Sequence, residues 1–245
     1  MYQKRTYRNL IHRENLVSFK VAVKETDLFI HAAKNLKDNT RELVLQKRGH
    51  IEAYISRYPE FTKTLEPWHL RGPAPNIIQD MIKAGKVTGV GPMAAVAGAI
   101  AEHVGIELLS YTDEVVVENG GDVFLKTNSP VKIGIFAGTS PLSLRIGLRI
   151  ASENRPMSVC TSSGTVGHSL SLGNSDAVCA VSESCSLADA AATSIGNHVK
   201  SKNDIQKAID FGNKIEGITG LIIIMGDKIG VWGGLEIVPL DGKRG

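Results

Sequence analysis

The stretch Ser186-Leu-Ala-Asp-Ala-Ala-Ala-Thr193 is rich in alanine and carries a single acid. Alanine favours an α-helix, and residues four apart on a helix share a face, so Asp189 and Thr193 are expected to lie one turn apart on the same side. A carboxylate and a hydroxyl are oxygen ligands, which suit a hard cation such as Mg²⁺ better than zinc. The methyl groups around them allow another backbone to approach closely. We therefore predict a divalent metal site at Asp189 and Thr193.

A second interpretation of the same residues is a helix cap. Ser186 as the N-cap, with Asp189 three residues later, fits the pattern of a capping box. An acid near a helix N-terminus is also favoured by the helix dipole, and the Thr193 hydroxyl can donate back to the carbonyl of residue 189. What the other segments bring to this helix decides between the two interpretations.

The composition indicates an ordinary globular protein. The chain has 245 residues, of which 42% are hydrophobic, and its formal net charge of +3 is too small to indicate nucleic-acid binding. No apolar run reaches the roughly 18 residues of a membrane span, and the N-terminus lacks the apolar core of a signal peptide. We expect a cytoplasmic protein that binds a small molecule and neither nucleic acid nor a membrane. A homo-oligomer is left open.

The alternation of apolar and polar residues predicts an α+β fold, mostly an antiparallel sheet with helices packed on it. A hairpin is expected over 18–33, with its turn at Thr26-Asp27. Helices are expected over 38–57, 76–84, 92–104, 187–199 and 204–214. Further strands are expected over 115–117, 123–125, 131–137, 142–150, 158–161, 177–181, 221–225 and 229–232. No linker divides the chain, so we expect a single domain over 1–245, with a hairpin and helix in 1–70 and the core in 71–245.

Four segments rich in glycine or serine lie where strands meet loops or helices. Backbone N–H groups in such turns and at helix starts bind anions, so together these segments predict a site for a phosphorylated or dinucleotide ligand. Neither a P-loop nor a complete Rossmann motif is present. Each segment taken alone also fits a simple turn or loop. The four are Gly89-Val-Gly-Pro92, Asn119-Gly-Gly-Asp122, Thr161-Ser-Ser-Gly-Thr-Val-Gly-His168 and the start of the 186–193 helix.

Four motifs follow one another along the chain: Val90-Gly-Pro-Met-Ala-Ala-Val-Ala-Gly-Ala-Ile-Ala101, Val117-Glu-Asn-Gly-Gly-Asp122, Ser163-Gly-Thr-Val-Gly-His168 and Leu187-Ala-Asp-Ala-Ala-Ala-Thr193. Their order resembles the ApbE superfamily of flavin transferases, in particular a short, uncharacterised prokaryotic branch. The resemblance implies an ApbE-like fold and a site for Mg²⁺ and FAD or FMN. In the family, FAD is cleaved and FMN is moved onto a Thr or Ser of a target protein.

The resemblance also assigns roles to individual residues. It implies metal binding by Asp189 and Thr193, and a catalytic role for His168. The residues expected to frame the ligand are Asn119, Gly120, Gly121, Asp122, Thr161, Ser162, Ser163 and Gly164. The chain departs from the family pattern in two places: the Asp-Pro and Thr-Gly pairs are missing after His168, and Glu102 stands near the position of the family's lysine. These departures argue against FMN transfer.

The three cysteines, Cys160, Cys179 and Cys185, include no C-x-x-C pair and suggest reduced thiols. Cys185 directly precedes the alanine-rich helix, where the helix dipole lowers a thiol pKa and favours a nucleophile. This predicts an alternative function, a thiol- or persulfide-based accessory protein in sulfur assimilation with Cys185 as its catalytic residue. The plainer interpretation is that the cysteines are buried apolar residues. A third alternative is an assembly module that kept the fold without an activity.

Overall fold

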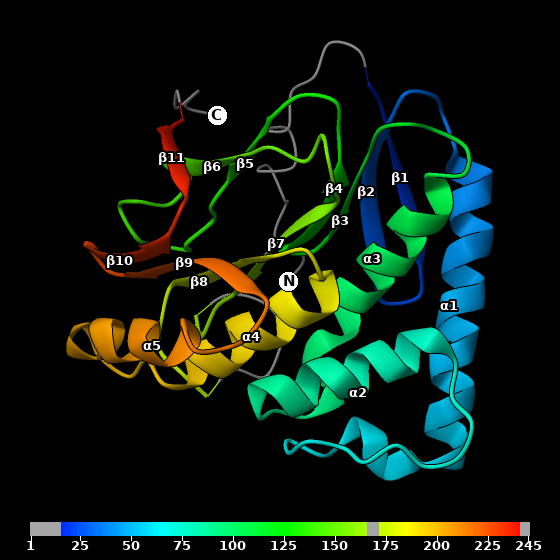
Figure 1. The fold of residues 1–245 in the computed structure, drawn as a ribbon, viewed down its shortest axis with the longest axis horizontal. Helices are drawn as coiled ribbons and strands as arrows, with labels where there is room; N and C mark the ends of the chain where they lie inside the picture. The colour runs from blue at the N-terminus through cyan, green and yellow to red at the C-terminus, as the bar shows by residue number, and fades with distance from the viewer. Residues whose placement is uncertain (1–15, 166–171, 241–245) are drawn as a thin grey trace.

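An eight-stranded antiparallel sheet is the frame of the molecule (Figure 1). The computed structural model describes residues 16–165 and 172–240. The strands lie in the order β1-β2-β3-β4-β7-β8-β9-β10. Their bounds are β1 Val17–Val23, β2 Thr26–Ala32, β3 Val115–Asn119, β4 Asp122–Lys126, β7 Met157–Ser162, β8 Ala177–Ser182, β9 Ile218–Met225 and β10 Lys228–Gly233.

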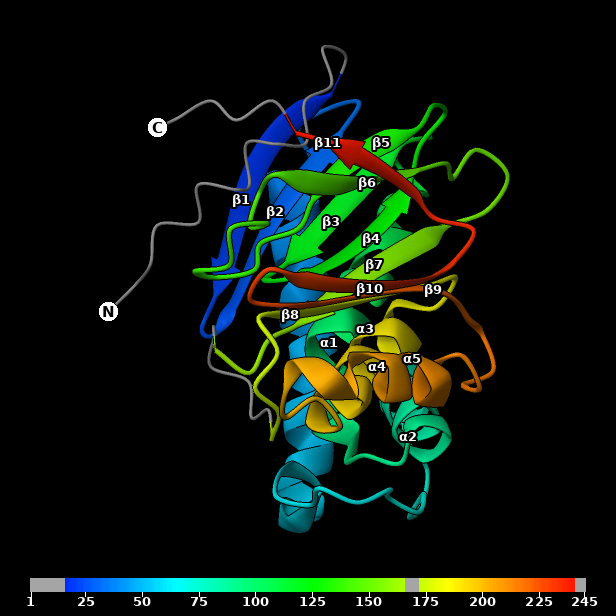
Figure 2. The same cartoon turned by 90° about the vertical axis from the view of Figure 1, so that its left-hand side faces the viewer.

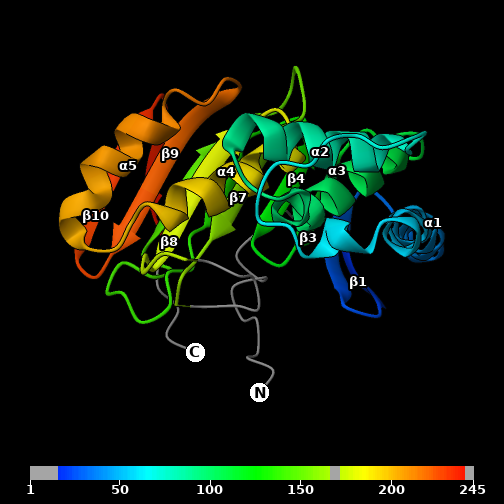
Figure 3. The same ribbon diagram turned by 90° about the horizontal axis from the view of Figure 1, so that it is seen from below.

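The helices gather on one face of this sheet, as Figure 3 shows. Their apolar sides share one buried cluster with that face, which includes Val44, Ile100, Ile195 and Ile223. The helices are α1 Lys37–Arg57, α2 Asn76–Thr88, α3 Val96–Leu108, α4 Cys185–Asn197 and α5 Ile205–Gly212, with short 3₁₀ turns at η2 Pro59–Thr62, η3 Pro92–Ala95 and η4 Lys202–Asp204.

A small three-stranded sheet covers the opposite face (Figure 2). It consists of β5 (Val131–Gly134), β6 (Ile146–Ile150) and β11 (Glu236–Pro239). A second apolar cluster joins the two sheets; it contains Ile133 and Leu148 from the small sheet, and Val159 from the large one. The molecule is therefore layered, with helices, a large sheet and a small sheet in succession.

The predicted α+β class with a mostly antiparallel sheet is confirmed, but several boundaries differ. The first hairpin turns at Lys24, which has a φ of 51°, so Thr26 and Asp27 are buried strand residues and the turn predicted there is wrong. Helix α2 continues through Gly85 and ends at Thr88, and the next residue, Gly89, has a φ of 74° and forms the left-handed C-cap that terminates helices. The single domain over 1–245 stays a prediction.

Strand alternation decides which side chains of the large sheet face the helices. Asp122 on β4 lies opposite Cys160 on β7 in the strand register. Cys160 belongs to the cluster on the helix side, whereas its neighbour Val159 belongs to the cluster between the sheets. Since opposed residues point to the same face of a sheet, Asp122 also points towards the helix layer.

Within residues 16–165 and 172–240, no single helix has the length and apolar character to cross a membrane. Helix α2 and the segment Pro92–Leu108 pass such a test only when taken together across a bend of 109°. Both carry residues of the buried cluster on the helix side, such as Met81 and Val104.

Candidate functional site around the start of helix α3

The Asp189 carboxylate lies against the first turn of α3. Its Oδ2 accepts a hydrogen bond from the Gly98 backbone N–H at 2.8 Å. The N-cap residue of α3, Ala95, has no side chain that can accept from these N–H groups. An acid from the middle of α4 therefore serves as the missing cap of α3. Its negative charge also interacts favourably with the positive end of the α3 dipole.

Helix α4 has its own cap, which is not the predicted one. The N-cap is Ser184, whose Oγ accepts from the Leu187 N–H at 3.3 Å. The predicted capping box is therefore wrong: the N-cap lies two residues before Ser186, and Asp189 bonds to Gly98 of α3 instead. Because Asp189 bonds to α3 and not to the start of its own helix, the acid is available for a site between the two helices.

Burial raises the pKa of Asp189 to about 7, against the opposing effect of the Gly98 and Ala97 N–H groups, although part of the residue remains in contact with solvent. Burial also raises the pKa of Asp122 well above its ordinary value, and the charge of Asp189 raises it further. The two carboxylates thus disfavour each other's ionisation. Such a pair favours a proton or a cation between its members.

The Asn119-Gly-Gly turn joins α3 to the sheet. Asn119 Nδ2 donates to the Ala97 carbonyl oxygen at 3.0 Å, next to the residue that binds Asp189. Gly120 has a φ of 74°, which allows a turn of two residues between β3 and β4. A Cβ on Gly121 would lie 2.7 Å from the Thr161 carbonyl oxygen, so only glycine lets β7 come this close. The turn, the start of α3 and the end of β7 therefore meet.

Asp122 is not on the surface of that turn. Its side chain is buried, and the neighbouring Cys160 thiol and Thr161 N–H partly offset the rise in its pKa. Asp122 is therefore a buried residue near enough to Asp189 to feel its charge, and is not exposed to frame a ligand.

The residues of the segment 161–164 contact different parts of the molecule. The Thr161 backbone N–H donates to the Gly121 carbonyl oxygen at 3.0 Å, but its hydroxyl donates to Cys179 Sγ on the other face of the sheet. Ser162 is buried, and Gly164 N–H donates to the Ser175 carbonyl oxygen at 2.9 Å, with Ser163 beside it in the loop. The Thr161 backbone is thereby joined to the turn beside the Asp189 region. His168 lies outside the described residues.

Thr193 is partly exposed and lies one helical turn after Asp189 on α4. The spacing places both on one side of the helix, as the sequence predicts. Across the described ranges, no three His, Cys, Asp or Glu side chains form a metal-ligating group. A cation site here would therefore consist of Asp189, the Thr193 hydroxyl, and ligands from backbone, solvent or a bound molecule.

Glu102 and Gly98 were not among the predicted site residues. Gly98 allows α3 to touch α4, because a Cβ there would lie 2.4 Å from the Cys185 carbonyl oxygen. Glu102, four residues later on the same face, accepts from the Ser186 N–H at 2.9 Å. The spacing of a glycine and an acid on one helix face was the available signal.

The cysteines are buried, with Cys160 Sγ 3.5 Å from Cys185 Sγ. Burial raises the pKa of Cys185 to about 11. The lowered pKa expected at the start of α4 is therefore wrong, because removal of the thiolate from water outweighs the helix dipole. This environment does not favour a nucleophile at Cys185.

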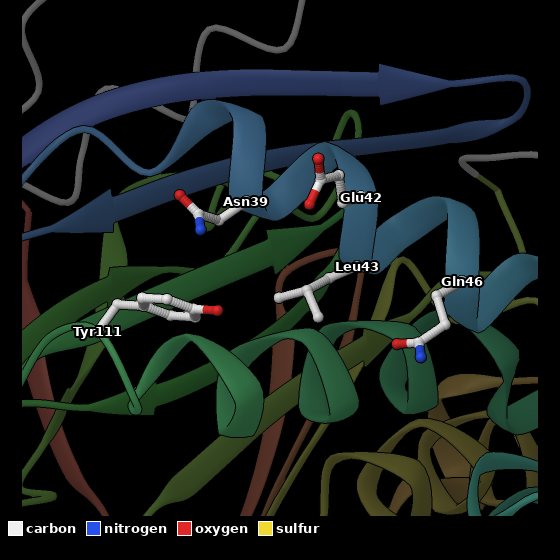
Figure 4. A pocket seen from close by; sticks show the side chains of 5 residues that line it. All are labelled: Asn39, Glu42, Leu43, Gln46 and Tyr111. Carbon is white, nitrogen blue, oxygen red and sulfur yellow. The ribbon is translucent and has the colours of Figure 1, made fainter.

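Two shallow cavities lie away from the Asp189 region. One of about 320 Å³ lies between α1 and the end of α3, and is lined by Asn39, Glu42, Leu43, Gln46 and Tyr111 (Figure 4). Another of about 490 Å³ lies between the C-terminal ends of α2 and α5. The second cavity is lined in part by Gly89, from the first of the four glycine- or serine-rich segments, and neither cavity includes Asp189 or Thr193.

Comparisons with known proteins support the resemblance that the four motifs suggest. A family model described as AbpE bacteria matches residues 8–230. A UPF0280 protein of Methanococcus aeolicus is 40% identical over 238 residues, covering 93% of this chain and 95% of that protein. Another, from Methanocella arvoryzae, is 40% identical over 218 residues and covers 88% of each chain.

Among solved structures, the apo form of the Pseudomonas stutzeri flavinyl transferase ApbE is similar, with a TM-score of 0.55 and 14% identity over 89% of this chain and 93% of that one. At this identity the likeness shows a shared fold. The predicted ApbE-like fold and the resemblance are confirmed. The chain therefore belongs to the AbpE bacteria family and has an ApbE-like fold.

Proposed function

We propose that this protein binds a flavin or another phosphorylated small molecule together with a divalent cation held by Asp189 and Thr193. The observation that carries the proposal is the Asp189 carboxylate at the first turn of α3, held there by the Gly98 N–H at 2.8 Å. The Asn119 side chain attaches to the same turn of α3. Three of the motifs with ligand-binding character thus converge on one place.

The charges at this place fit a cation. Asp189 and Asp122 each have a raised pKa, and a divalent ion offsets the repulsion between two ionised carboxylates. A carboxylate has two oxygens, so Asp189 can keep its bond to Gly98 and still ligate an ion. The Thr193 hydroxyl adds a second oxygen ligand on the same face. When bound, the ion would neutralise an oxygen of a phosphate or pyrophosphate.

The backbone around the cation site suits an anionic ligand. Gly121 carries no side chain and is exposed, so a ligand can approach the backbone of this turn closely. The positive end of the α3 dipole lies beside this turn. The ApbE proteins of Pseudomonas stutzeri and Vibrio cholerae, which share the fold, are described as flavin transferases. This likeness supports a flavin as the first ligand to test.

The proposal is limited to binding and does not extend to FMN transfer. Glu102, near the position of the family's lysine, accepts hydrogen bonds from Ser186 at the start of α4. A carboxylate there cannot provide the positive charge that a lysine would offer to a phosphate.

The test is a thermal-shift titration of the full chain with FAD and with FMN, each with and without Mg²⁺, combined with the visible spectrum of the purified protein. We expect flavin and Mg²⁺ together to raise Tm more than either alone, and Asp189→Ala to abolish the contribution of Mg²⁺. Asp210→Ala, an exposed acid on α5, is the matched control and should leave the shift unchanged. The proposal is overturned if no flavin shifts the wild-type Tm, or if Asp189→Ala responds as the wild type does.

A further inference from the structure

Glu102 forms a compact set of hydrogen bonds with the start of α4. Its Oε2 accepts from the Ser186 N–H at 2.9 Å, the Ser186 hydroxyl at 2.9 Å and the Ser184 hydroxyl at 3.3 Å. All three donors belong to the N-cap and first turn of α4, and the acceptor belongs to the middle of α3. One carboxylate oxygen therefore fixes the beginning of one helix to the side of another.

The set is the counterpart of the contact that Asp189 makes. Asp189, from the middle of α4, caps the first turn of α3 through Gly98, and Glu102, from the middle of α3, caps the first turn of α4. Gly98 permits the close approach that both contacts need. We call Glu102 and Asp189 the reciprocal caps. Each cap fixes the helix from which the other cap projects.

We infer that Glu102 is a positioning residue for the cation site, which holds the first turn of α4 so that Asp189 and Thr193 stay against the start of α3. This inference rests on the proposed function. Asp189 follows Ser186 by three residues, about 4.5 Å along a helix. A first turn that loses its anchor frays, and the carboxylate one turn later then loses its fixed direction.

The charge and geometry argue for positioning and not for direct ligation. Glu102 Oε2 accepts from three donors at the start of α4, so this oxygen holds the helix, whereas the proposed cation lies at Asp189 and Thr193. Removing a residue that orients a metal ligand typically costs about 10- to 100-fold in metal affinity. Removing an ordinary helix cap lowers stability and leaves the affinity of a distant site unchanged.

The experiment is calorimetric titration of the full chain with Mg²⁺ alone, for the wild type, Glu102→Ala, Glu102→Gln and Asp204→Ala. Asp204 is the matched control, because it caps the turn before α5 through Ser201 and is far along the chain from the site. We expect Glu102→Ala to weaken Mg²⁺ binding by at least about tenfold. Glu102→Gln keeps an acceptor oxygen and should stay within about threefold of the wild type, and Asp204→Ala should not change the affinity.

A second measurement on the same variants is hydrogen exchange at the Gly98 amide without any cation. Glu102→Ala should speed this exchange, because Asp189 loses its fixed place, whereas Asp204→Ala should not. The inference is overturned if Glu102→Ala binds Mg²⁺ as the wild type does, if Glu102→Gln is as weak as Glu102→Ala, or if Gly98 exchange is unchanged. A wild type that fails to bind Mg²⁺ overturns the proposed function, and the positioning role falls with it.

Discussion

The starts of α3 and α4 are capped in different ways. Helix α4 begins with its own Ser184 as N-cap, and its start donates three hydrogen bonds to Glu102. Helix α3 begins at Ala95, which offers no side-chain acceptor, and depends on Asp189 from α4. Burial leaves that acid with a pKa of about 7.

We propose that the difference separates a contact that anchors a helix start from one that belongs to the cation site. The start of α4 is arranged for stability, since a local serine and an acid together satisfy its N–H groups. The start of α3 uses an acid that is costly to keep ionised where it lies. Costly groups of this kind tend to be found at functional sites, which is why we place the cation at α3 and not at α4.

The largest effect is expected from Gly98→Ala, which breaks both helix starts at once. The new Cβ would lie 2.4 Å from the Cys185 carbonyl oxygen and 2.8 Å from Asp189 Cβ, so α3 and α4 must separate. We expect the free energy of unfolding to fall by about 3 kcal/mol in urea denaturation. Gly49→Ala on α1, where a Cβ meets nothing within 4 Å, is the control and should raise stability by about 0.5–1 kcal/mol. Equal effects of the two changes would contradict the close contact of α3 and α4.

The next largest effect distinguishes Asp189 from Glu102. Asp189→Asn keeps an oxygen that can accept from Gly98 N–H and removes a charge that burial disfavours, so Tm without cation should rise by a few degrees near pH 8, about 1 kcal/mol. Glu102→Gln should lower Tm or leave it unchanged, because it weakens an anchor at a helix start. A fall in Tm for Asp189→Asn would show that its charge stabilises the fold and would remove the distinction between the two starts.

A smaller effect concerns pH. The folded-state pKa of Asp189, about 7, lies above its ordinary value of 3.8, so its proton stabilises the fold and this contribution is lost as the pH rises through about 7. A divalent ion needs the ionised form, and Mg²⁺ affinity should therefore increase from about pH 6 to about pH 8. Titrations at several pH values measure this. A flat profile, or one that falls with pH, would contradict the role of Asp189.

The smallest expected effect is at Cys185, the first residue of α4. Burial raises its pKa to about 11, so it should resist alkylation by iodoacetamide near pH 8 in the folded protein and react once the protein is unfolded. Mass spectrometry of the labelled chain measures the difference. Fast labelling of folded protein would revive the thiol-based alternative.

The sequence was sufficient for local features of the site and insufficient for contacts between distant segments. The spacing of Asp189 and Thr193 predicted their shared face, and the Asn119-Gly-Gly turn was found from its residue types. The bond from Gly98 to Asp189 joins residues 91 positions apart, and no local pattern reports such a contact. The depth of burial at Cys185 depends on the same long-range packing, so its pKa could not be judged from the helix start alone.

Alternation within the sheet explains a further limit. Asp122 follows two glycines and looks like a residue of an exposed turn, but its register with Cys160 directs it towards the helices. The third strand of the small sheet, β11, follows β10 after a short break and lacks a pattern that distinguishes it from loop. Register and sheet membership are tertiary properties, so both needed the structure.

The most direct test of the account is the response of the Gly98 and Ala97 amide NMR signals to added Mg²⁺. We predict that Mg²⁺ shifts both signals in the wild type, because the acid bonded to them becomes a metal ligand, and that Asp189→Asn abolishes the shifts. Signals that stay in place in the wild type, or that move equally in Asp189→Asn, would contradict the cation site at the start of α3.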